Sequence, residues 1–363
     1  MDPDASRPPR RGARPSARAS MSDVARLAGV SGQTVSRVAN GSLAVREDTR
    51  RRVLDAMEQL GYSPNTAARA LRSGSFETIG LIAHQLARTG ESRTVEGVVH
   101  AAHARGHTVT LLDLESTAHE EVSEAAQRLS HQAIDGLIII RAETADASRV
   151  ALPANLPVVV ADAGFGRMLP MVGADHAAGA RLAVEHLLSL GHRTVHHVAG
   201  PADSIPAQAR LHAWRAVLAE HRIVPPEPLR GDWTSASGEV AGARIADMPD
   251  ATAVFAANDE MAAGIMLALE RAGRHVPHDV SVVGFDDIPL AGYLTTPLTT
   301  VRQPFGEIGA RLVERLMSRL DGSEDPGPRA ELVPCELVLR ESTAPPAWAR
   351  EPLRGLPDHH LGP

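Results

Sequence analysis

The sequence predicts an α/β fold in which an N-terminal unit of three helices, with a helix-turn-helix, precedes two lobes built on doubly wound parallel sheets. Three observations predict it. Two short amphipathic helical patterns meet at Gly29 inside an Arg-rich segment, and short apolar runs alternate with helical stretches from residue 76 onward. The chain has 363 residues, and cores of the size that the alternating region would need tend to split, so we expect two lobes there.

The first helix of the N-terminal unit is expected to begin after Ser20. Ser20 and Asp23 have the S-x-x-D spacing of a capping box, in which each residue satisfies a backbone donor near the other. Gly29 is expected to end this helix, since glycine readily adopts the conformation that helix ends require. We expect its apolar face to consist of Ala25, Leu27 and Ala28.

The second helix is the candidate DNA-reading element. Ser31 is its predicted N-cap, and Val35 and Val38 are its predicted inward positions, which leaves Gln33 and Arg37 exposed together with Gly32 and Ser36. Gln and Arg can make paired hydrogen bonds to an adenine or guanine edge in the major groove. For any one of these residues alone, an ordinary amphipathic surface helix is the better-supported interpretation, and the combination is what indicates a DNA-binding unit.

A third helix is expected from Arg46 to Leu60, ending at Gly61, and it closes a helical domain over residues 20–63. Its predicted inward positions are Val53, Leu54, Met57 and Leu60. Near its start lie three consecutive arginines, for which a solvated face and a phosphate contact are both open interpretations: Arg50, Arg51 and Arg52.

Charge is divided unevenly along the chain. Residues 1–75 hold 13 Arg against 7 Asp and Glu, a net charge of +6, whereas the remainder has a net charge of −13. This asymmetry indicates an anionic partner for the N-terminal part only. Residues 1–19 are rich in Arg and Pro and are predicted to form a disordered basic leader.

Residues 64–75 are predicted to form a linker that contains a short helix. Pro64 begins an Ala-rich segment that is too brief to be a stable helix in water, so it is expected to fold only when docked.

Residues 76–342 are predicted to form the two lobes. Strands are expected at 79–83, 108–112, 136–140, 158–161, 194–199, 253–256 and 280–285, and helices at 95–105, 177–190, 208–220 and 259–272. Such alternation predicts parallel sheets flanked by helices.

Polar side chains stand where these strands end, which is where open α/β sheets bind ligands. His84, Arg141, Asp162, Asn258, Asp259, Asp286 and Asp287 are the residues concerned, and the segments around Arg210 and Trp233 are expected nearby. Carboxylates and amides that accept hydrogen bonds from hydroxyls, an arginine that donates, and a flat aromatic face together predict a carbohydrate-binding cleft. A structural ion pair of Arg210 with Asp286, and a core role for Trp233, are the alternatives.

The chain resembles the LacI/GalR family of transcriptional regulators from about residue 20 to about residue 342. The resemblance lies in DVARLAGVSGQTVSRVANG and TRRRVLDAMEQLGYSPNTAARAL near the N-terminus. It continues in GLIII, VEHLLSLGHRTVHHVAGP, FAANDEMAAGIMLAL and DVSVVGFDDIPLAGYLTTPLTTVRQP, at 136–140, 184–201, 255–269 and 279–304. The lobes it implies also resemble periplasmic sugar-binding proteins.

For the DNA-binding part, the resemblance implies that residues 64–75 hold a hinge helix that enters the minor groove. Leu71 matches the residue that wedges between base pairs, with Asn65 and Ala68 beside it. Contacts to phosphate or to the minor groove are also expected from Ser31, Thr34 and Asn40. Gly32 departs from the family, because a base-reading side chain is usual there.

For the lobes, the resemblance implies an effector site. Arg210, Asn258 and Asp286 match the family's effector-contacting positions, while Asp162, Trp233 and Phe305 match the sugar pocket of one member. His84 is included because it occupies a small-residue position at the cleft. Pro206 stands where a hydroxyl is found near the sugar, and both changes leave the identity of the sugar open.

The function implied is that of a sequence-specific cytoplasmic repressor that a small carbohydrate releases from double-stranded, near-palindromic operator DNA. A sugar-responsive activator and a corepressor-dependent regulator remain alternatives, because no residue gives the sign of the response. Residues 343–363 form a Pro-rich tail that is predicted to be disordered. The tail lacks the Leu heptads with which some family members form tetramers, so a homodimer is expected.

Other classes of function have little support in the sequence. It contains no G-x-S-x-G elbow and no phosphate-binding G-x-x-x-x-G-K-[ST] loop, so an enzyme is not expected. His100, His103 and His107 have helical spacing, but the sequence forms no recognisable metal-ligand set, and no cofactor is predicted. No apolar run is long enough to cross a membrane. The single Cys335 is expected to be a small buried hydrophobe.

Overall fold

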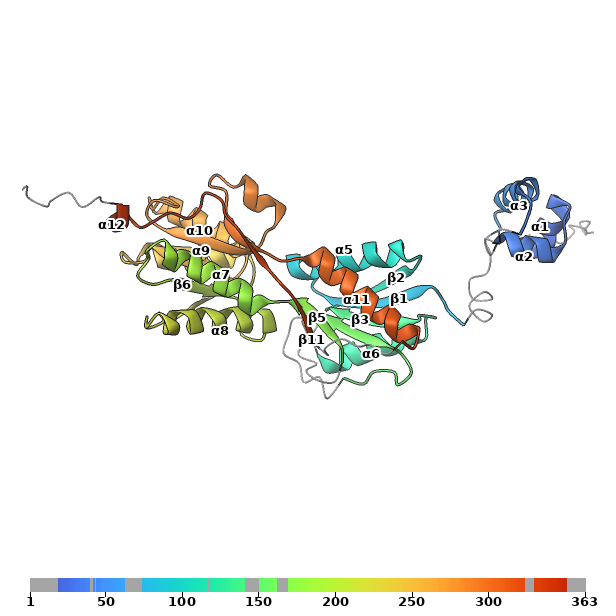
Figure 1. Cartoon of the computed structure of the whole chain (residues 1–363), viewed down its shortest axis with the longest axis horizontal. Helices are drawn as coiled ribbons and strands as arrows, with labels where there is room; N and C mark the ends of the chain where they lie inside the picture. Colours follow the sequence, from blue (N-terminus) through green and yellow to red (C-terminus); the bar gives the residue numbers. More distant parts are fainter. Residues whose placement is uncertain are drawn as a thin grey trace, which may run out of the picture. The chain divides into compact units, whose positions relative to one another are not determined.

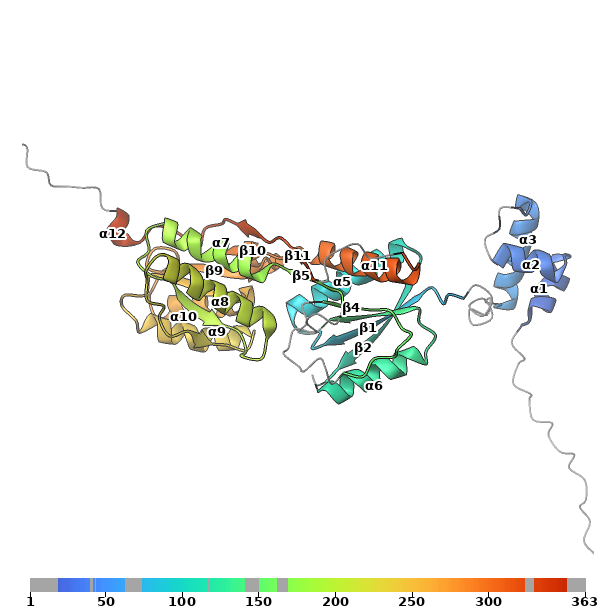
Figure 2. The same cartoon turned by 60° about the horizontal axis from the view of Figure 1, so that its bottom comes forward.

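The computed structural model describes residues 19–39, 42, 44–62, 74–115, 118–140, 150–161, 169–323 and 330–350. The chain divides into two compact units, Met1–Phe76 and Glu77–Pro363. Both units can be followed in Figures 1 and 2.

The first unit contains α1 (Met21–Ala28), α2 (Gly32–Ala39) and α3 (Glu47–Leu60). The capping box of Ser20 with Asp23 is confirmed, and Gly29 ends α1 in a left-handed conformation with φ 66°. Ser31 caps α2, because its hydroxyl accepts a hydrogen bond from the Thr34 backbone N–H at 3.2 Å. Gly61 ends α3 with φ 59°. The helical boundaries thus follow from local capping chemistry.

The core of the first unit corrects two sequence predictions. Leu27 and Leu54, both predicted to face inward, are half exposed, and Ala25 is only partly buried. The buried faces are instead defined by residues three and four apart on each helix, which lie above one another. They are Val24 and Ala28 on α1, Val35 and Val38 on α2, and Val53, Ala56 and Met57 on α3.

The second unit contains two six-stranded sheets, one in each lobe. The first has the order β11-β5-β4-β3-β1-β2 and is entirely parallel. Its strands are β1 (Thr78–His84), β2 (Thr108–Leu114), β3 (Gly136–Ile140), β4 (Val158–Ala161), β5 (Met171–Ala174) and β11 (Ala330–Val333).

The second sheet repeats this arrangement with the order β12-β10-β9-β8-β6-β7, and only β12 is antiparallel to its neighbour. Its strands are β6 (His196–Ala199), β7 (Leu229–Arg230), β8 (Ala253–Ala256), β9 (Ser281–Asp286), β10 (Thr299–Arg302) and β12 (Glu336–Val338). The strand order reverses direction between β1 and β3 in one sheet and between β6 and β8 in the other. Ligands bind such sheets at these switch points.

Helices cover both faces of each sheet (Figure 1). In the first lobe, α5 (Thr89–Ala104) and α11 (Phe305–Leu320) pack together on one face and α6 (His119–Ser130) lies on the other. In the second lobe, the pairs are α7 (His176–Ser189) with α8 (Ile205–Glu220), and α9 (Ser235–Ala246) with α10 (Asp259–Arg271). A short 3-10 helix, η2, spans Pro289–Tyr293. No helix among the described residues is long and apolar enough to span a membrane.

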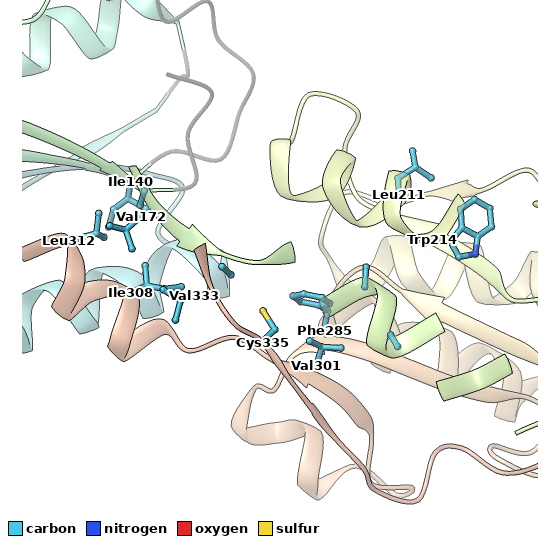
Figure 3. Packing of buried hydrophobic residues seen from close by; sticks show 14 of the residues in the cluster. Ile140, Val172, Leu211, Trp214, Phe285, Val301, Ile308, Leu312, Val333 and Cys335 are labelled. Atoms are coloured by element: carbon cyan, nitrogen blue, oxygen red, sulfur yellow. The ribbon is translucent and has the colours of Figure 1, made fainter. Parts of the chain in front are cut away.

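The chain passes between the lobes three times, between β5 and α7, between β10 and α11, and between β11 and β12. One apolar core runs through these crossings. Figure 3 shows Cys335 beside Val333 at one end of the crossing and near Phe285 and Val301 at the other. Cys335 is buried, as predicted, and it contributes to this shared core.

All seven predicted strands are present within two residues of their expected bounds, but several elements were not predicted. They are α6, α9, α11, β5, β7, β10, β11 and β12. The missing strands have two to four residues each, and every one of them contains a Gly, a Thr or a charged residue, so none forms a continuous apolar run. Helix α5 begins six residues earlier than expected because its first turn is polar and has no side-chain cap.

The predicted disordered tail from residue 343 differs from the structure over residues 343–350. The Ala344 backbone N–H donates to the Ser281 hydroxyl at 3.0 Å, and α12 spans Ala347–Arg350. The Arg193 guanidinium lies 4.7 Å from the centre of the Trp348 ring, a cation–π contact. The segment is therefore held against the second lobe. The leader 1–18, most of the linker 64–75 and the tail 351–363 lie outside the described residues.

Candidate functional site

The exposed face of α2 carries the two residues predicted to read bases. Gln33 and Arg37 are both exposed, while Val35 and Val38 anchor the helix to the core of the unit. Ser31 and Thr34 hydrogen-bond to each other at 3.0 Å between their hydroxyl oxygens, so both are positioned at the start of the helix. Thus α2 is held rigidly by its buried face and presents an amide and a guanidinium to the outside.

The arginine cluster of α3 separates into different environments. Arg50 donates to the Ser42 backbone carbonyl at 2.5 Å and lies 3.8 Å from Glu47, so it holds the segment between α2 and α3. Arg51 and Arg52 are exposed. Four residues predicted to contact phosphate or the minor groove lie outside the described residues, namely Asn40, Asn65, Ala68 and Leu71.

A cavity of about 500 Å³ lies between the two lobes of the second unit, within the range typical of ligand sites. The first lobe contributes the segment from Gln85 to Thr94 and the ends of β2, β3 and β4. The second lobe contributes the starts of α7, α8 and α10 and the loop before α9. Five of the predicted effector residues line the cavity: Arg210, Trp233, Asn258, Asp286 and Phe305.

Arg210 lies on α8, and only 3% of it is exposed. Its guanidinium donates to the Ala257 carbonyl, lies 3.2 Å from His176 Nδ1 and stacks on Phe285 with 3.8 Å to the ring centre. The Nη2 atom is 3.8 Å from Asp286 Oδ1. The charge is therefore fixed by several contacts at the wall of the cavity.

Asp286 ends β9 opposite Arg210, with 6% of it exposed. Burial raises the pKa of this carboxyl to about 7, against the attraction of Arg210, and the nearby Glu260 adds to the rise. Gln303 donates to Oδ1, whereas Oδ2 accepts no hydrogen bond from any residue that the structure describes. The backbone φ of 118° is rare for a residue with a side chain. Such strain is concentrated at functional sites.

Asn258 and Glu260 are adjacent to this pair at the start of α10. The Asn258 side chain caps the helix by accepting from Met261 N–H at 3.0 Å, and its amide donates to Glu260 Oε2 at 2.8 Å. Glu260 Oε1 accepts from the hydroxyl of Thr89, which belongs to the other lobe. Glu260 thus connects the two walls of the cavity.

Trp233 provides the flat apolar face that the sequence predicts. Its backbone has φ 78°, and its carbonyl accepts from the Asn258 amide at 3.0 Å. The indole lies 5.5 Å from the Arg210 guanidinium and against Gly200, where a Cβ atom would approach the ring to 2.5 Å. Phe305 begins α11 and adds a second aromatic ring from the other lobe.

The structure does not place His84 at the cavity. It is the last residue of β1 and is buried, but it does not line the cavity, and the following Gln85 does. Asp259 also points away: its oxygens accept from Thr300 and from the backbone N–H of Ile288. For His84, alternation of side chains along the end of β1 gives the residue and its neighbour different sides. Asp162 lies outside the described residues.

Other cavity residues were not predicted as site residues: His176, Gln303, Thr89, Glu91, Asp113, Asp232 and Glu260. Gln303 follows β10, which was not predicted, whereas Asp113 comes directly after the predicted strand 108–112 and could have been found by the same rule. The others stand in helix starts and loops. Glu260 was detectable, because it lies two residues after Asn258.

The histidines with helical spacing do not gather into a site in the described structure. His100 and His103 are exposed on α5, and His107 follows it. Among the residues that the structure describes, no group of three or more His, Cys, Asp or Glu is placed to hold a metal ion.

Comparison with known proteins gives two matching families. Residues 20–65 match the description bacterial regulatory proteins, lacI family, and residues 184–343 match a periplasmic binding protein-like domain. The lactose operon repressor of Escherichia coli K12 is 35% identical over 342 residues, which cover 93% of this chain and 94% of the relative. The ribose operon repressor of the same strain is 33% identical, covering 87% and 97%, and the purine repressor PurR of Vibrio vulnificus is 31% identical, covering 89% and 98%.

Solved structures show the same architecture. A lac repressor dimer bound to operator and the anti-inducer ONPF has a TM-score of 0.81 at 34% identity, covering 90% of this chain and 99% of that chain. The regulator CelR in complex with cellobiose has a TM-score of 0.68 at 32% identity, covering 90% and 100%.

Proposed function

The chain belongs to the lacI family of bacterial regulatory proteins, and we propose that it is a dimeric repressor which a small sugar releases from its operator. It is a DNA-binding transcriptional regulator and not an enzyme. The observation that carries the proposal is the buried pair of Arg210 and Asp286 at the wall of a cavity that both lobes line. We propose a cytoplasmic location, because that is where a bacterial operator lies.

For DNA recognition we propose that Gln33 and Arg37 read bases in the major groove, since both are exposed on the capped helix α2. Ser31, Thr34 and Asn40 are proposed to contact phosphates. Asn65, Ala68 and Leu71 are proposed to enter the minor groove, where an inserted Leu kinks the duplex.

For effector recognition we propose that Asp286 accepts a hydrogen bond from a sugar hydroxyl and that Arg210 donates to a neighbouring oxygen. The free lone pairs of Asp286 Oδ2 support this, since a buried acceptor gains most from a donor. Asn258, Asp162 and Phe305 are proposed to complete the polar and apolar contacts, and Trp233 to stack on the apolar face of the sugar. His84 is not proposed as a ligand contact, because Gln85 takes the place beside the cavity.

Regulation follows from ligand contacts on both walls. A ligand that touches both lobes favours one arrangement of them, and it can shift the DNA-binding equilibrium only if it binds the two states unequally. Thr89 and Glu260 hydrogen-bond across the cleft, so we propose that this contact responds to a change in the arrangement of the lobes.

The test is selection of binding sites from random duplexes, followed by titration of the selected duplex with sugars in the presence of protein. We expect a near-palindromic sequence and its release by one or more sugars. Arg37→Ala is expected to relax the preference at one base position and to cost about 1 to 3 kcal/mol on the selected site. Identical preferences for mutant and wild type would remove Arg37 from base reading, and absence of any sequence preference would refute the proposed function.

A further inference from the structure

We propose that the cleft is selective for charge: it accepts a hydroxyl-rich ligand without anionic groups and rejects phosphorylated or carboxylated ligands, with Glu260 as a specificity-determining residue. This inference rests on the proposed function, because it concerns the effector of that site. It goes further because it states the chemical class of the effector and names the residue that excludes anionic ligands.

The first observation is the charge of the cavity wall. Its described residues include five carboxylates and two guanidiniums, since Glu91, Asp113, Asp232, Glu260 and Asp286 stand against Arg88 and Arg210. The wall therefore has an excess of negative charge, and in a cleft with low-dielectric walls such an excess acts strongly on a charged ligand.

The second observation is that both guanidiniums are occupied. Arg88 lies 3.8 Å from Glu91, and Arg210 is held by Asp286, the Ala257 carbonyl and His176. A phosphate would have to displace these partners to obtain a paired contact with arginine. Asp113, Asp232 and Glu260, in contrast, form no ion pair with any residue that the structure describes.

The third observation concerns the helix starts around the cavity. Helices α8, α9 and α10 begin there, and a helix start ordinarily attracts anions. Each of these starts is already capped, by Ser204, Thr234 and Asn258 in turn. Helix α5 and helix α10 also carry acidic residues in their first turns, Glu91 and Glu260. Helices α7 and α11 also begin at the cavity, the first capped by Asp175 and the second carrying Glu307 in its first turn. Each helix start at the cavity thus has a side-chain cap or an acidic residue, which weakens its attraction for an anion.

Glu260 is the decisive residue because it belongs to both walls. It accepts from Thr89 of one lobe and from Asn258 of the other, so its two oxygens are fixed and its charge stays inside the cleft when the walls meet. A ligand hydroxyl can donate to this carboxylate, whereas a ligand phosphate meets a like charge.

The experiment uses matched ligands and calorimetric titration of the full chain. The pairs are glucose with glucose 6-phosphate and trehalose with trehalose 6-phosphate, and lactose, cellobiose and glucosamine are added singly. We expect the best ligand to be free of anionic groups and each phosphate ester to bind at least tenfold more weakly than its parent. Glucosamine binding above glucose would identify a cationic sugar within the same class. A phosphate ester that binds as tightly as its parent overturns the proposal.

The Glu260→Gln variant tests the residue. In this variant the ratio of the Kd of the phosphate ester to the Kd of its parent sugar is expected to fall by roughly tenfold. One charge is removed while an acceptor oxygen is kept. Glu270→Gln is the matched control, since Glu270 is exposed at the far end of the same helix and its loss should leave the ratio unchanged. An unchanged ratio in Glu260→Gln overturns the role of Glu260.

Inorganic phosphate separates failure of this inference from failure of the proposed function. If no sugar binds while the operator is still recognised, the sugar class of the proposed function fails. Thermal stability in millimolar phosphate then decides the inference about charge. The inference is supported if phosphate does not stabilise the wild type but does stabilise the double variant Glu260→Gln and Asp232→Asn. Stabilisation of the wild type that Arg210→Ala removes would overturn it.

Discussion

Asp286 and Asp287 are consecutive carboxylates at the end of β9, and the fold gives them opposite surroundings. Asp287 is held by two guanidiniums, with Arg340 Nη2 at 2.5 Å from Oδ1 and Arg302 Nε at 2.7 Å from Oδ2. Asp286 has one arginine at 3.8 Å and an amide donor, and it borders the cavity. Both residues have positive φ angles, 118° and 56°, and their carboxyl groups have different partners.

The pKa values of the two carboxyl groups shift in opposite directions, as their different surroundings require. Burial raises the pKa of Asp286 to about 7, and a single distant arginine does not offset it. Burial also acts to raise the pKa of Asp287, but the hydrogen bonds from Arg340 and Arg302 outweigh it, and the pKa is lowered. A carboxylate with both oxygens paired supports the fold, whereas one with an open oxygen beside a cavity is available to a ligand.

The largest expected effect is loss of effector binding on removal of the incompletely paired group. Asp286→Ala and Arg210→Ala should each weaken effector binding by about 2 kcal/mol or more, because the remaining partner is left buried and unpaired. Operator binding by the ligand-free protein should persist. Calorimetry of the effector beside an operator-binding assay on the same preparations checks this. Equal losses of thermal stability and operator binding, without a selective effect on the effector, would make the pair purely structural.

Asp287→Ala should have the opposite phenotype. It leaves Arg340 and Arg302 without their shared carboxylate, so the free energy of unfolding should fall by about 2 kcal/mol. Effector affinity, measured on the folded fraction at low temperature, should stay within a few-fold of wild type. Denaturant unfolding gives the stability. A selective loss of effector affinity at unchanged stability would contradict the contrast drawn between the two residues.

The pH dependence should differ in sign between the two positions. For Asp286 the folded pKa of about 7 exceeds the ordinary value of 3.8, so its contribution to stability is present below about pH 4 and lost as the pH rises through about 7. For Asp287 the folded pKa is lowered, so its contribution is present above pH 3.8 and lost as the pH falls through the folded pKa. Unfolding of Asp286→Asn and Asp287→Asn against wild type, at several pH values, should give differences with opposite slopes. Parallel slopes would rule out this assignment.

The smallest effect is expected at Gly200. An added Cβ would approach the Trp233 ring to 2.5 Å, so Gly200→Ala should displace the indole and weaken effector binding by up to about tenfold. Trp233→Phe is the control, because it keeps an aromatic ring at this position but removes the fluorescence of Trp233. The measurement is the change in tryptophan fluorescence on effector addition. Wild-type affinity and fluorescence in Gly200→Ala would show that the position of the ring is unimportant.

The sequence predicts this molecule best where local chemistry decides the outcome. Ser20 with Asp23, Gly29 and Gly61 set helix ends within a few residues, and the apolar runs that became β1, β3 and β9 are long enough to recognise. The prediction that Leu27 and Leu54 face inward was wrong, because an apolar residue fits a helical pattern even when its side chain is exposed. Only tertiary packing selects the buried face.

The candidate site was predictable where a polar residue follows a recognisable strand. Asn258 and Asp286 were found in this way, and they border the cavity. Gln303 and His176 were not, because the strands before them, β10 (TTVR) and β5 (MVGA), contain polar residues or Gly and so form no continuous apolar run. His84 shows the limit of the rule, since a shift of one residue at a strand end reverses the side that a side chain faces.

The most direct test compares the two neighbouring carboxylates in one titration. Labelled operator is bound to wild type, Asp286→Asn or Asp287→Asn, and the anisotropy is followed as effector is added. We predict release from wild type and from folded Asp287→Asn at similar effector concentrations, while Asp286→Asn stays bound at concentrations that saturate the wild type. Release of Asp286→Asn at the wild-type concentration would contradict the central claim that Asp286 connects effector binding to DNA binding.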